Sequence, residues 1–216
     1  MNNINTVSFY EKHSLGIRIW HWTFFILLLC SMSTVLLAST VFRTRNNTAL
    51  VREQLQQNGL TVSQEQARVV SHAFSDKVWE LHTWIGYFVA AFLLGRIILE
   101  VFQPSDEKLS TRIKGVMGLR PLLPEARRAQ EHYIRVKWGY VLFYFLIGVM
   151  AVTGLGLAFE DVAFFKSIRG ALKQLHSFTQ YGIYGFVLLH LAGVILADAG
   201  RYPGLVSGMI HGRKRF

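Results

Sequence analysis

Charged residues and cysteines are scarce in this sequence. Only 17% of the 216 residues are charged and 51% are hydrophobic, whereas a typical soluble domain carries about 25% charged residues. The single cysteine, Cys30, has no second cysteine to pair with, so an internal disulfide is excluded, and we expect a small buried apolar residue at this position. The deficit of charge is localised, because long apolar runs alternate with short charge-rich stretches. This pattern indicates a membrane protein.

Four apolar windows are long enough to cross a bilayer as helices, which requires roughly 20 mostly apolar residues. The sequence therefore predicts an all-α fold, an integral membrane four-helix bundle that forms one domain over residues 1–216. The expected spans are about 15–42, 78–102, 136–159 and 175–200.

The net charge of +10 is distributed unevenly between the two sides of such a bundle. The N-terminal segment, the loop from Gln103 to Lys137 and the tail after Gly200 share one side and together hold 14 lysine and arginine residues. The two opposite loops hold eight, mixed with six acidic residues. Because cytoplasmic loops are enriched in Lys and Arg, both termini are predicted to be cytoplasmic. This placement favours a membrane lipid surface and argues against nucleic acid as the partner.

The connections between the spans differ in character. The outer loop 43–76 is long, and a short helix of its own is expected over 61–70, with Ser63 as its cap. The inner loop 104–137 contains Gly115, Gly118, Pro121 and Pro124, so we expect it to be segmented. A short amphipathic stretch over 162–173 is expected to lead into the fourth span.

Four histidines fall inside or at the edge of a span: His21, His82, His176 and His190. Ionisable residues within membrane helices are costly and by default functional, although any one of them could instead donate a hydrogen bond between helices. His176 and His190 are 14 residues apart on one predicted helix. This spacing places both on nearly the same face, about 21 Å apart along the axis.

The antiparallel topology matches these histidines in depth. His21 is expected opposite His190 on the inner side, and His82 opposite His176 on the outer side. Haem iron takes two axial ligands, and facing helices of a bundle hold cofactors in its core. No C-x-x-C-H segment is present for covalent attachment. The constellation therefore predicts two non-covalent, bis-histidine b haems, whereas zinc would need four clustered ligands.

Other ionisable residues admit two interpretations. Arg96 and Arg18 could each pair with a propionate of the inner haem. Alternatively, Arg96 forms an ion pair with Glu100 or extends its guanidinium to the membrane interface, and Arg18 only follows the charge bias of the inner side. His13 could donate a proton to a reduced quinone, although a solvated surface histidine is the simpler interpretation. The remaining histidines are expected at surfaces, namely His72, His132 and His211.

Several segments resemble the family of bacterial cytochrome b561 and nickel–iron hydrogenase b-type cytochromes. The resemblance rests on Arg18-Ile19-Trp20-His21-Trp22, on His82-Thr83-Trp84-Ile85-Gly86, on Thr153-Gly154, on the His176/His190 pair and on the closing 203–212 segment. It implies two b haems, electron exchange with membrane quinone and a location in the bacterial inner membrane. It also implies, in many members, a periplasmic redox partner such as a hydrogenase, formate dehydrogenase or thiosulfate reductase.

The sequence leaves three functions open. The leading hypothesis is a di-haem electron-transfer subunit, with or without further oligomerisation, that connects a periplasmic partner to the quinone pool of a respiratory chain. The alternative is a stand-alone quinone-linked oxidoreductase that acts on a small diffusible species such as superoxide. A third hypothesis, a transporter or proton channel, would not require two histidine pairs at matched depths.

Overall fold

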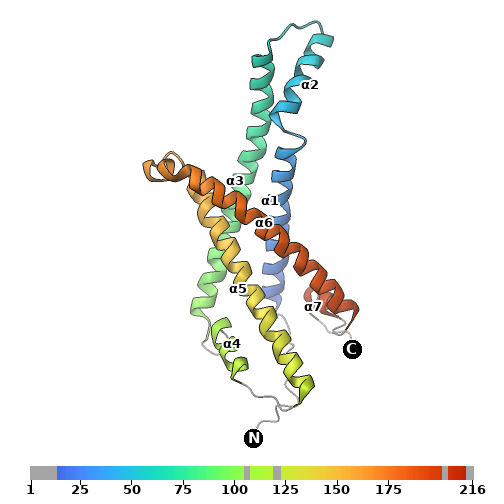
Figure 1. The fold of residues 1–216 in the computed structure, drawn as a ribbon, viewed down its shortest axis with the longest axis vertical. Helices are drawn as coiled ribbons and strands as arrows, with labels where there is room; N and C mark the ends of the chain where they lie inside the picture. The colour runs from blue at the N-terminus through green and yellow to red at the C-terminus, as the bar shows by residue number, and fades with distance from the viewer. Residues whose placement is uncertain (1–13, 105–107, 119–122, 201–203, 213–216) are drawn as a thin grey trace. The chain divides into compact units, whose positions relative to one another are not determined.

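The computed structural model describes residues 14–104, 108–118, 123–200 and 204–212, apart from the side chains of Arg112, Glu125 and Leu205. These residues form helices and no strand, which confirms the predicted all-α fold. The helices, shown in Figure 1, are α1 (Leu15–Ser39), α2 (Thr44–Gln57), α3 (Gln64–Phe102), α4 (Leu109–Met117), α5 (Pro124–Ala158), α6 (Ala163–Ala199) and α7 (Leu205–His211).

Four helices, α1, α3, α5 and α6, are long and apolar enough to cross a membrane. Their surfaces carry many exposed large apolar side chains, including Phe178 and Leu189 of α6, which are 77% and 76% exposed. A soluble monomer rarely exposes so much apolar surface, whereas lipid covers it at no cost. The chain is therefore a multi-pass membrane protein.

Cys30, expected to be buried, is exposed on α1, where lipid replaces a protein core.

Three of these helices are longer than the predicted spans. At 1.5 Å per residue, the 39 residues of α3 measure about 58 Å, nearly twice the hydrocarbon thickness of about 30 Å. The α3 helix begins at Gln64, so the short helix expected over 61–70 is instead the first part of α3. The separate helix in this loop is α2, which was not predicted from the sequence. The stretch expected before the fourth span likewise belongs to α6.

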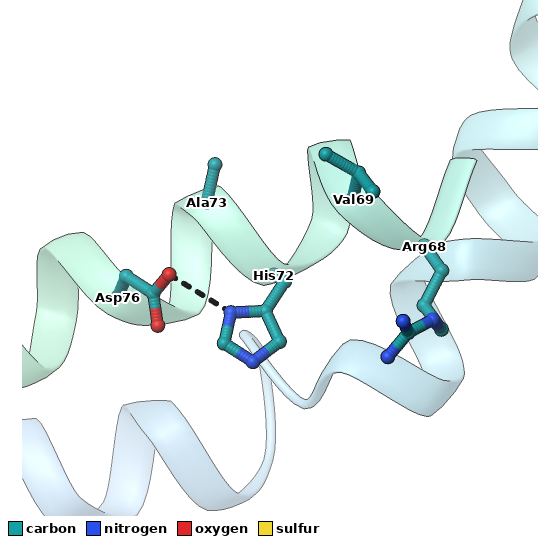
Figure 2. Close-up of a pocket in the computed structure, with 5 residues that line it drawn as sticks. All are labelled: Arg68, Val69, His72, Ala73 and Asp76. Carbon is teal, nitrogen blue, oxygen red and sulfur yellow. Dashed lines mark hydrogen bonds and ion pairs between the residues drawn. The ribbon is translucent and has the colours of Figure 1, made fainter. Parts of the chain in front are cut away.

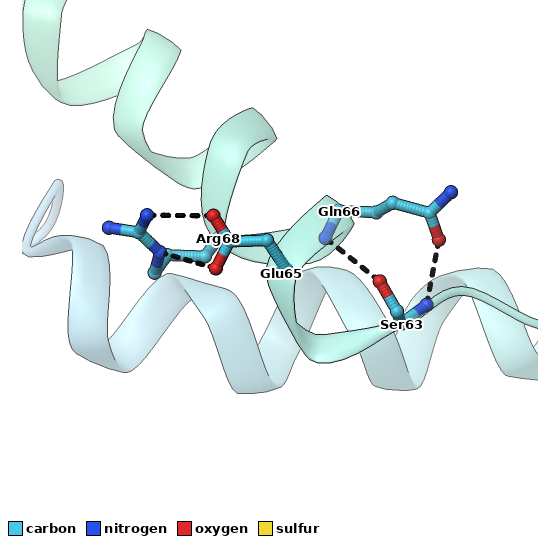
Figure 3. A network of polar contacts seen from close by, with 4 residues as sticks. All are labelled: Ser63, Glu65, Gln66 and Arg68. Carbon is cyan, nitrogen blue, oxygen red and sulfur yellow. Dashed lines mark hydrogen bonds and ion pairs between the residues drawn. The ribbon is translucent and has the colours of Figure 1, made fainter.

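A capping box fixes the start of α3 (Figure 3). The Gln66 backbone N–H donates to Ser63 Oγ at 3.2 Å, and the Ser63 N–H donates to Gln66 Oε1 at 2.8 Å. Ser63 is thus the cap that the sequence predicted. In the next turn, Arg68 donates to both carboxylate oxygens of Glu65, at 2.9 and 2.7 Å. Both residues lie before the predicted span 78–102. The hydrogen bonds from Arg68 hold the pKa of the Glu65 carboxyl below its usual value.

The chain divides into two compact units, one of residues 22–91 and one of residues 1–21 with 92–216. In the second unit α5 packs against α6, α4 packs against α5, and α7 packs against α6 (Figure 1). Glycines allow the close approach of α5 and α6. A Cβ atom at Gly156 would lie 2.8 Å from Leu172, and one at Gly182 would lie 3.2 Å from Leu146. These pairs run in opposite directions along the two helices, so α5 and α6 are antiparallel.

Short polar contacts tie the minor helices of this unit to the long ones. The Leu109 N–H at the start of α4 donates to Glu100 of α3 at 2.6 Å, and Gln130 of α5 donates to the Val116 carbonyl at 2.6 Å. The Val206 N–H of α7 donates to Asp198 of α6 at 3.1 Å. These bonds satisfy terminal backbone groups of α4 and α7 that have no partner within their own helix.

Candidate functional site

His21 and His190 lie together in the unit that contains α5 and α6. Their ring centroids are 6.3 Å apart, with 56° between the ring planes. His190 is exposed on the protein surface although its helix is apolar, and His21 is half-buried. A polar ring exposed in the middle of a membrane helix requires something other than lipid to cover it.

The separation of these two rings fits a shared metal ion. An imidazole nitrogen binds a metal at about 2 Å, which places the ring centroid about 3 Å from the ion. Two rings on opposite sides of one metal would therefore have centroids about 6 Å apart. This arrangement suits the two axial ligands of a haem iron.

Aromatic side chains lie beside His190 and next to His21 in the sequence. The Phe186 ring, one helical turn before His190, stacks on the imidazole with centroids 6.1 Å apart and only 6° between planes. Phe143 of α5 packs on Phe186 at 4.9 Å, and Trp20 lies 6.4 Å from Tyr144. Flat apolar side chains of this kind suit the faces of a macrocycle. In the sequence, the only sign of these aromatic contacts was the position of Phe186 four residues, about one helical turn, before His190.

His82 of α3 forms a hydrogen bond to α1. His82 Nδ1 lies 2.9 Å from Thr34 Oγ1, and this hydroxyl also donates to the Ser31 carbonyl at 2.7 Å. Thr34 is only 4% exposed, so the bond is protected from water. Thr34 is not predictable as a partner of His82 from the sequence, because a threonine in an apolar helix gives no sign of what it faces.

His176 of α6 repeats this arrangement against α5. His176 Nδ1 lies 2.9 Å from Thr153 Oγ1, which also donates to the Val149 carbonyl at 2.7 Å. Gly154 makes room for the ring, since a Cβ atom there would lie 3.2 Å from His176 Cε1. Beside Thr153, an apolar pocket of about 390 Å³ opens along α5 and is lined by Tyr144, Phe145, Gly148, Val149, Val152, Thr153 and Leu175.

The two arginines are held by other groups of the chain. Arg96 Nη2 lies 3.0 Å from Glu100 Oε2, the ion pair that was one of the two interpretations of Arg96. Arg18 Nη1 donates to the Ile210 carbonyl at 3.0 Å, at the end of α7. Each guanidinium group is therefore oriented by a partner within the chain. Arg96 lies on the same helix as His82, and Arg18 lies on the same helix as His21.

The histidines expected at surfaces are not part of these clusters. His72 is exposed in the first half of α3 and lies 2.8 Å from Asp76. Figure 2 shows both in a shallow pocket along one face of α3, with Arg68, Val69 and Ala73. His211 is exposed near the end of α7 and His132 is half-buried in α5. His13 lies outside the described residues, as do Lys12, Arg120 and all four Lys and Arg residues of the tail.

The fold and these contacts define a class: a multi-pass helical membrane protein with paired or oriented imidazoles suited to a metal macrocycle. The sequence matches the family model of prokaryotic cytochrome b561 over residues 12–212. The chain therefore belongs to the prokaryotic cytochrome b561 family and is a b-type haem membrane cytochrome of electron transfer. No curated protein and no solved structure matched the chain.

Proposed function

We propose that this chain holds two b haems and passes electrons across the bacterial inner membrane between an outer redox protein and the quinone pool. The observation that carries the proposal is the His21/His190 pair, whose rings are separated by the distance that one shared iron requires. The family supplies the class of protein, and this pair supplies the candidate ligands.

The second haem is proposed to be bound by His82 and His176. Both have their Nδ1 atoms hydrogen-bonded to a threonine of a neighbouring helix, a typical orientation for a metal-binding imidazole. His176 and His190 both lie in the continuous α6 helix, and their 14-residue spacing separates the two sites by about 21 Å along it. The pairing of His82 with His176 follows from the order and depth of the spans.

When bound, each haem supplies a one-electron couple. His21 with His190 and His82 with His176 would hold the two irons, and with two imidazoles on each iron the groups would serve electron transfer rather than substrate binding at the metal. Phe186, packed on Phe143, would give the haem an apolar aromatic contact on the His190 side. Arg18 and Arg96 are proposed to balance the propionate charges of the inner haem, with the Ile210 carbonyl and Glu100 fixing their guanidinium groups.

The excess of basic residues in the N-terminal segment, the 103–137 loop and the tail supports cytoplasmic termini. The inner haem would then face the cytoplasmic side, where electrons leave to quinone, and the outer haem would receive them. The α2 helix and the first turns of α3 would extend on the periplasmic side, where a redox protein would dock.

Haem content of purified single variants tests this assignment. Wild-type protein should contain two haems per chain, and each of His21→Ala, His82→Ala, His176→Ala and His190→Ala should contain one. His72→Ala is the matched control, because His72 lies on the same helix as His82 but is solvated, so both haems should remain. If His190→Ala kept both haems, the ligand assignment would be wrong. Co-purification of a second redox subunit would support the proposed electron-transfer subunit over the alternative, a stand-alone quinone-linked oxidoreductase.

A further inference from the structure

Thr34 and Thr153 occupy equivalent positions relative to two different histidines. Each is a buried threonine of one long helix whose hydroxyl contacts the Nδ1 atom of a histidine on the next long helix, at 2.9 Å in both cases. They are 4% and 2% exposed. The same contact therefore occurs once in each compact unit, at His82 and at His176.

The hydroxyl proton of each threonine is already committed. Thr34 Oγ1 donates to the Ser31 carbonyl at 2.7 Å, and Thr153 Oγ1 donates to the Val149 carbonyl at 2.7 Å. A carbonyl can only accept, and a hydroxyl has a single proton to donate. The threonine must therefore accept the bond from the imidazole, so Nδ1 of each histidine carries the proton.

A neutral imidazole with its proton on Nδ1 has its lone pair on Nε2. We propose that Thr34 and Thr153 are positioning residues that hold His82 and His176 in the tautomer that binds haem iron through Nε2. An acceptor at Nδ1 also makes the imidazole a more basic ligand, which stabilises ferric over ferrous iron. This inference rests on the proposed ligand role of the two histidines.

The test uses Thr34→Val and Thr153→Val, which keep the shape of the side chain and remove the acceptor. Haem affinity at the site should fall by about 10- to 100-fold. In chains that retain the haem, its midpoint potential should shift upward, while that of the haem bound by His21 and His190 stays unchanged. Redox titration of the purified protein, followed by optical absorbance, measures both potentials. Thr34→Ser and Thr153→Ser restore the hydroxyl and should return wild-type values.

Thr179→Val is the matched control. Thr179 is also buried, and its hydroxyl donates to the Leu175 carbonyl one turn back at 2.8 Å. Thr179→Val removes the same kind of bond as Thr153→Val, from a threonine hydroxyl to the carbonyl four residues earlier, but leaves the Thr153–His176 contact in place. The midpoint potentials of both haems should therefore stay at wild-type values. An equal shift in Thr179→Val and Thr153→Val would overturn the inference, because the effect would then come from helix packing.

The remaining outcomes separate this inference from the proposed function. Unchanged potential and affinity in both valine variants, with one haem lost in His82→Ala, would overturn the tautomer role and leave the ligand assignment intact. Loss of haem in a serine variant as severe as in its valine counterpart would also overturn it, because the hydroxyl would not be the active group. If Thr34→Val and Thr153→Val shifted different haems, the tautomer role would hold and the pairing of His82 with His176 would fail.

Discussion

Small side chains of α5 limit where the His176 ring of α6 can lie. Thr153 and Gly154 are consecutive on α5, and both contact His176: one bonds to Nδ1 and the other leaves space for Cε1. The imidazole is therefore positioned by one attraction and one steric limit. Under the proposed ligand role of His176, this Thr-Gly pair would leave the second ring nitrogen available for iron.

Replacing Gly154 with alanine should stabilise the α5 helix and weaken the binding of the haem held by His176. Alanine favours the helix by about 1 kcal/mol over glycine. Its Cβ atom, however, would lie only 3.2 Å from His176 Cε1, so the ring would have to move by a few tenths of an ångström. We expect α5 to remain folded by circular dichroism and the haem bound by His176 to be depleted, by up to about tenfold in affinity.

Gly139→Ala is the control for this change, because a Cβ atom at Gly139 of the same helix would meet nothing within 4 Å. That variant should keep the wild-type haem content. If both glycine variants bound haem as the wild type does, steric control of His176 by position 154 would be refuted.

At the scale of helices, the end of α7 is fixed to the start of α1. Arg18 donates to the Ile210 carbonyl, and Gly212 follows α7 with a left-handed φ of 69°. A Cβ atom at Gly212 would lie 2.7 Å from Arg18 Cζ. Glycine adopts this backbone conformation readily, and any larger residue would also require the Arg18 guanidinium to move.

Gly212→Ala should therefore detach α7 from the first turn of α1. The strained backbone alone costs of the order of 1 kcal/mol, and the clash with Arg18 adds to it. Limited proteolysis in detergent should cut the C-terminal segment faster than in the wild type. Gly208→Ala, in the same helix with nothing within 4 Å of its Cβ atom, should be cut at the wild-type rate. Equal rates for both variants would contradict the Arg18 contact.

The sequence predicted the four spans well, because burial in lipid is encoded by hydropathy alone. It predicted the ends of the helices poorly. Gln64 to Lys77 and Pro124 to Arg135 are polar, so nothing in their hydropathy shows that they continue α3 and α5. The packing of Ala67 and Ser71, both fully buried, indicates that helix contacts stabilise the first of these extensions.

The candidate site was predicted in part. The intramembrane positions and spacing of the four histidines were sufficient to nominate them, and their role as ligands stays a prediction. The structure places the rings of His21 and His190 6.3 Å apart. Thr34 and Thr153 were not nominated as partners of the histidines, because such a role depends on the rotation of one helix against another. That rotation is set by contacts such as Gly156 with Leu172, which a single sequence does not display.

For the molecule as a whole, the charge distribution predicts its orientation in the membrane. In a Cys30→Ser background, Gln56→Cys on α2 should react in intact cells with a maleimide that does not cross the inner membrane. Lys114→Cys on α4 should react only after the membrane is permeabilised. Both positions are exposed, so the difference reports sidedness. If only Lys114→Cys reacted in intact cells, the chain would have the opposite orientation to the one proposed.

The pairing of four histidines around two haems is the central claim, and haem counts of double variants test it most directly. His21→Ala combined with His190→Ala should remove one haem and leave one per chain, because both changes affect the same iron. His176→Ala combined with His190→Ala should leave none. If the first combination removed both haems, His21 and His190 would serve different irons, and the account would be contradicted.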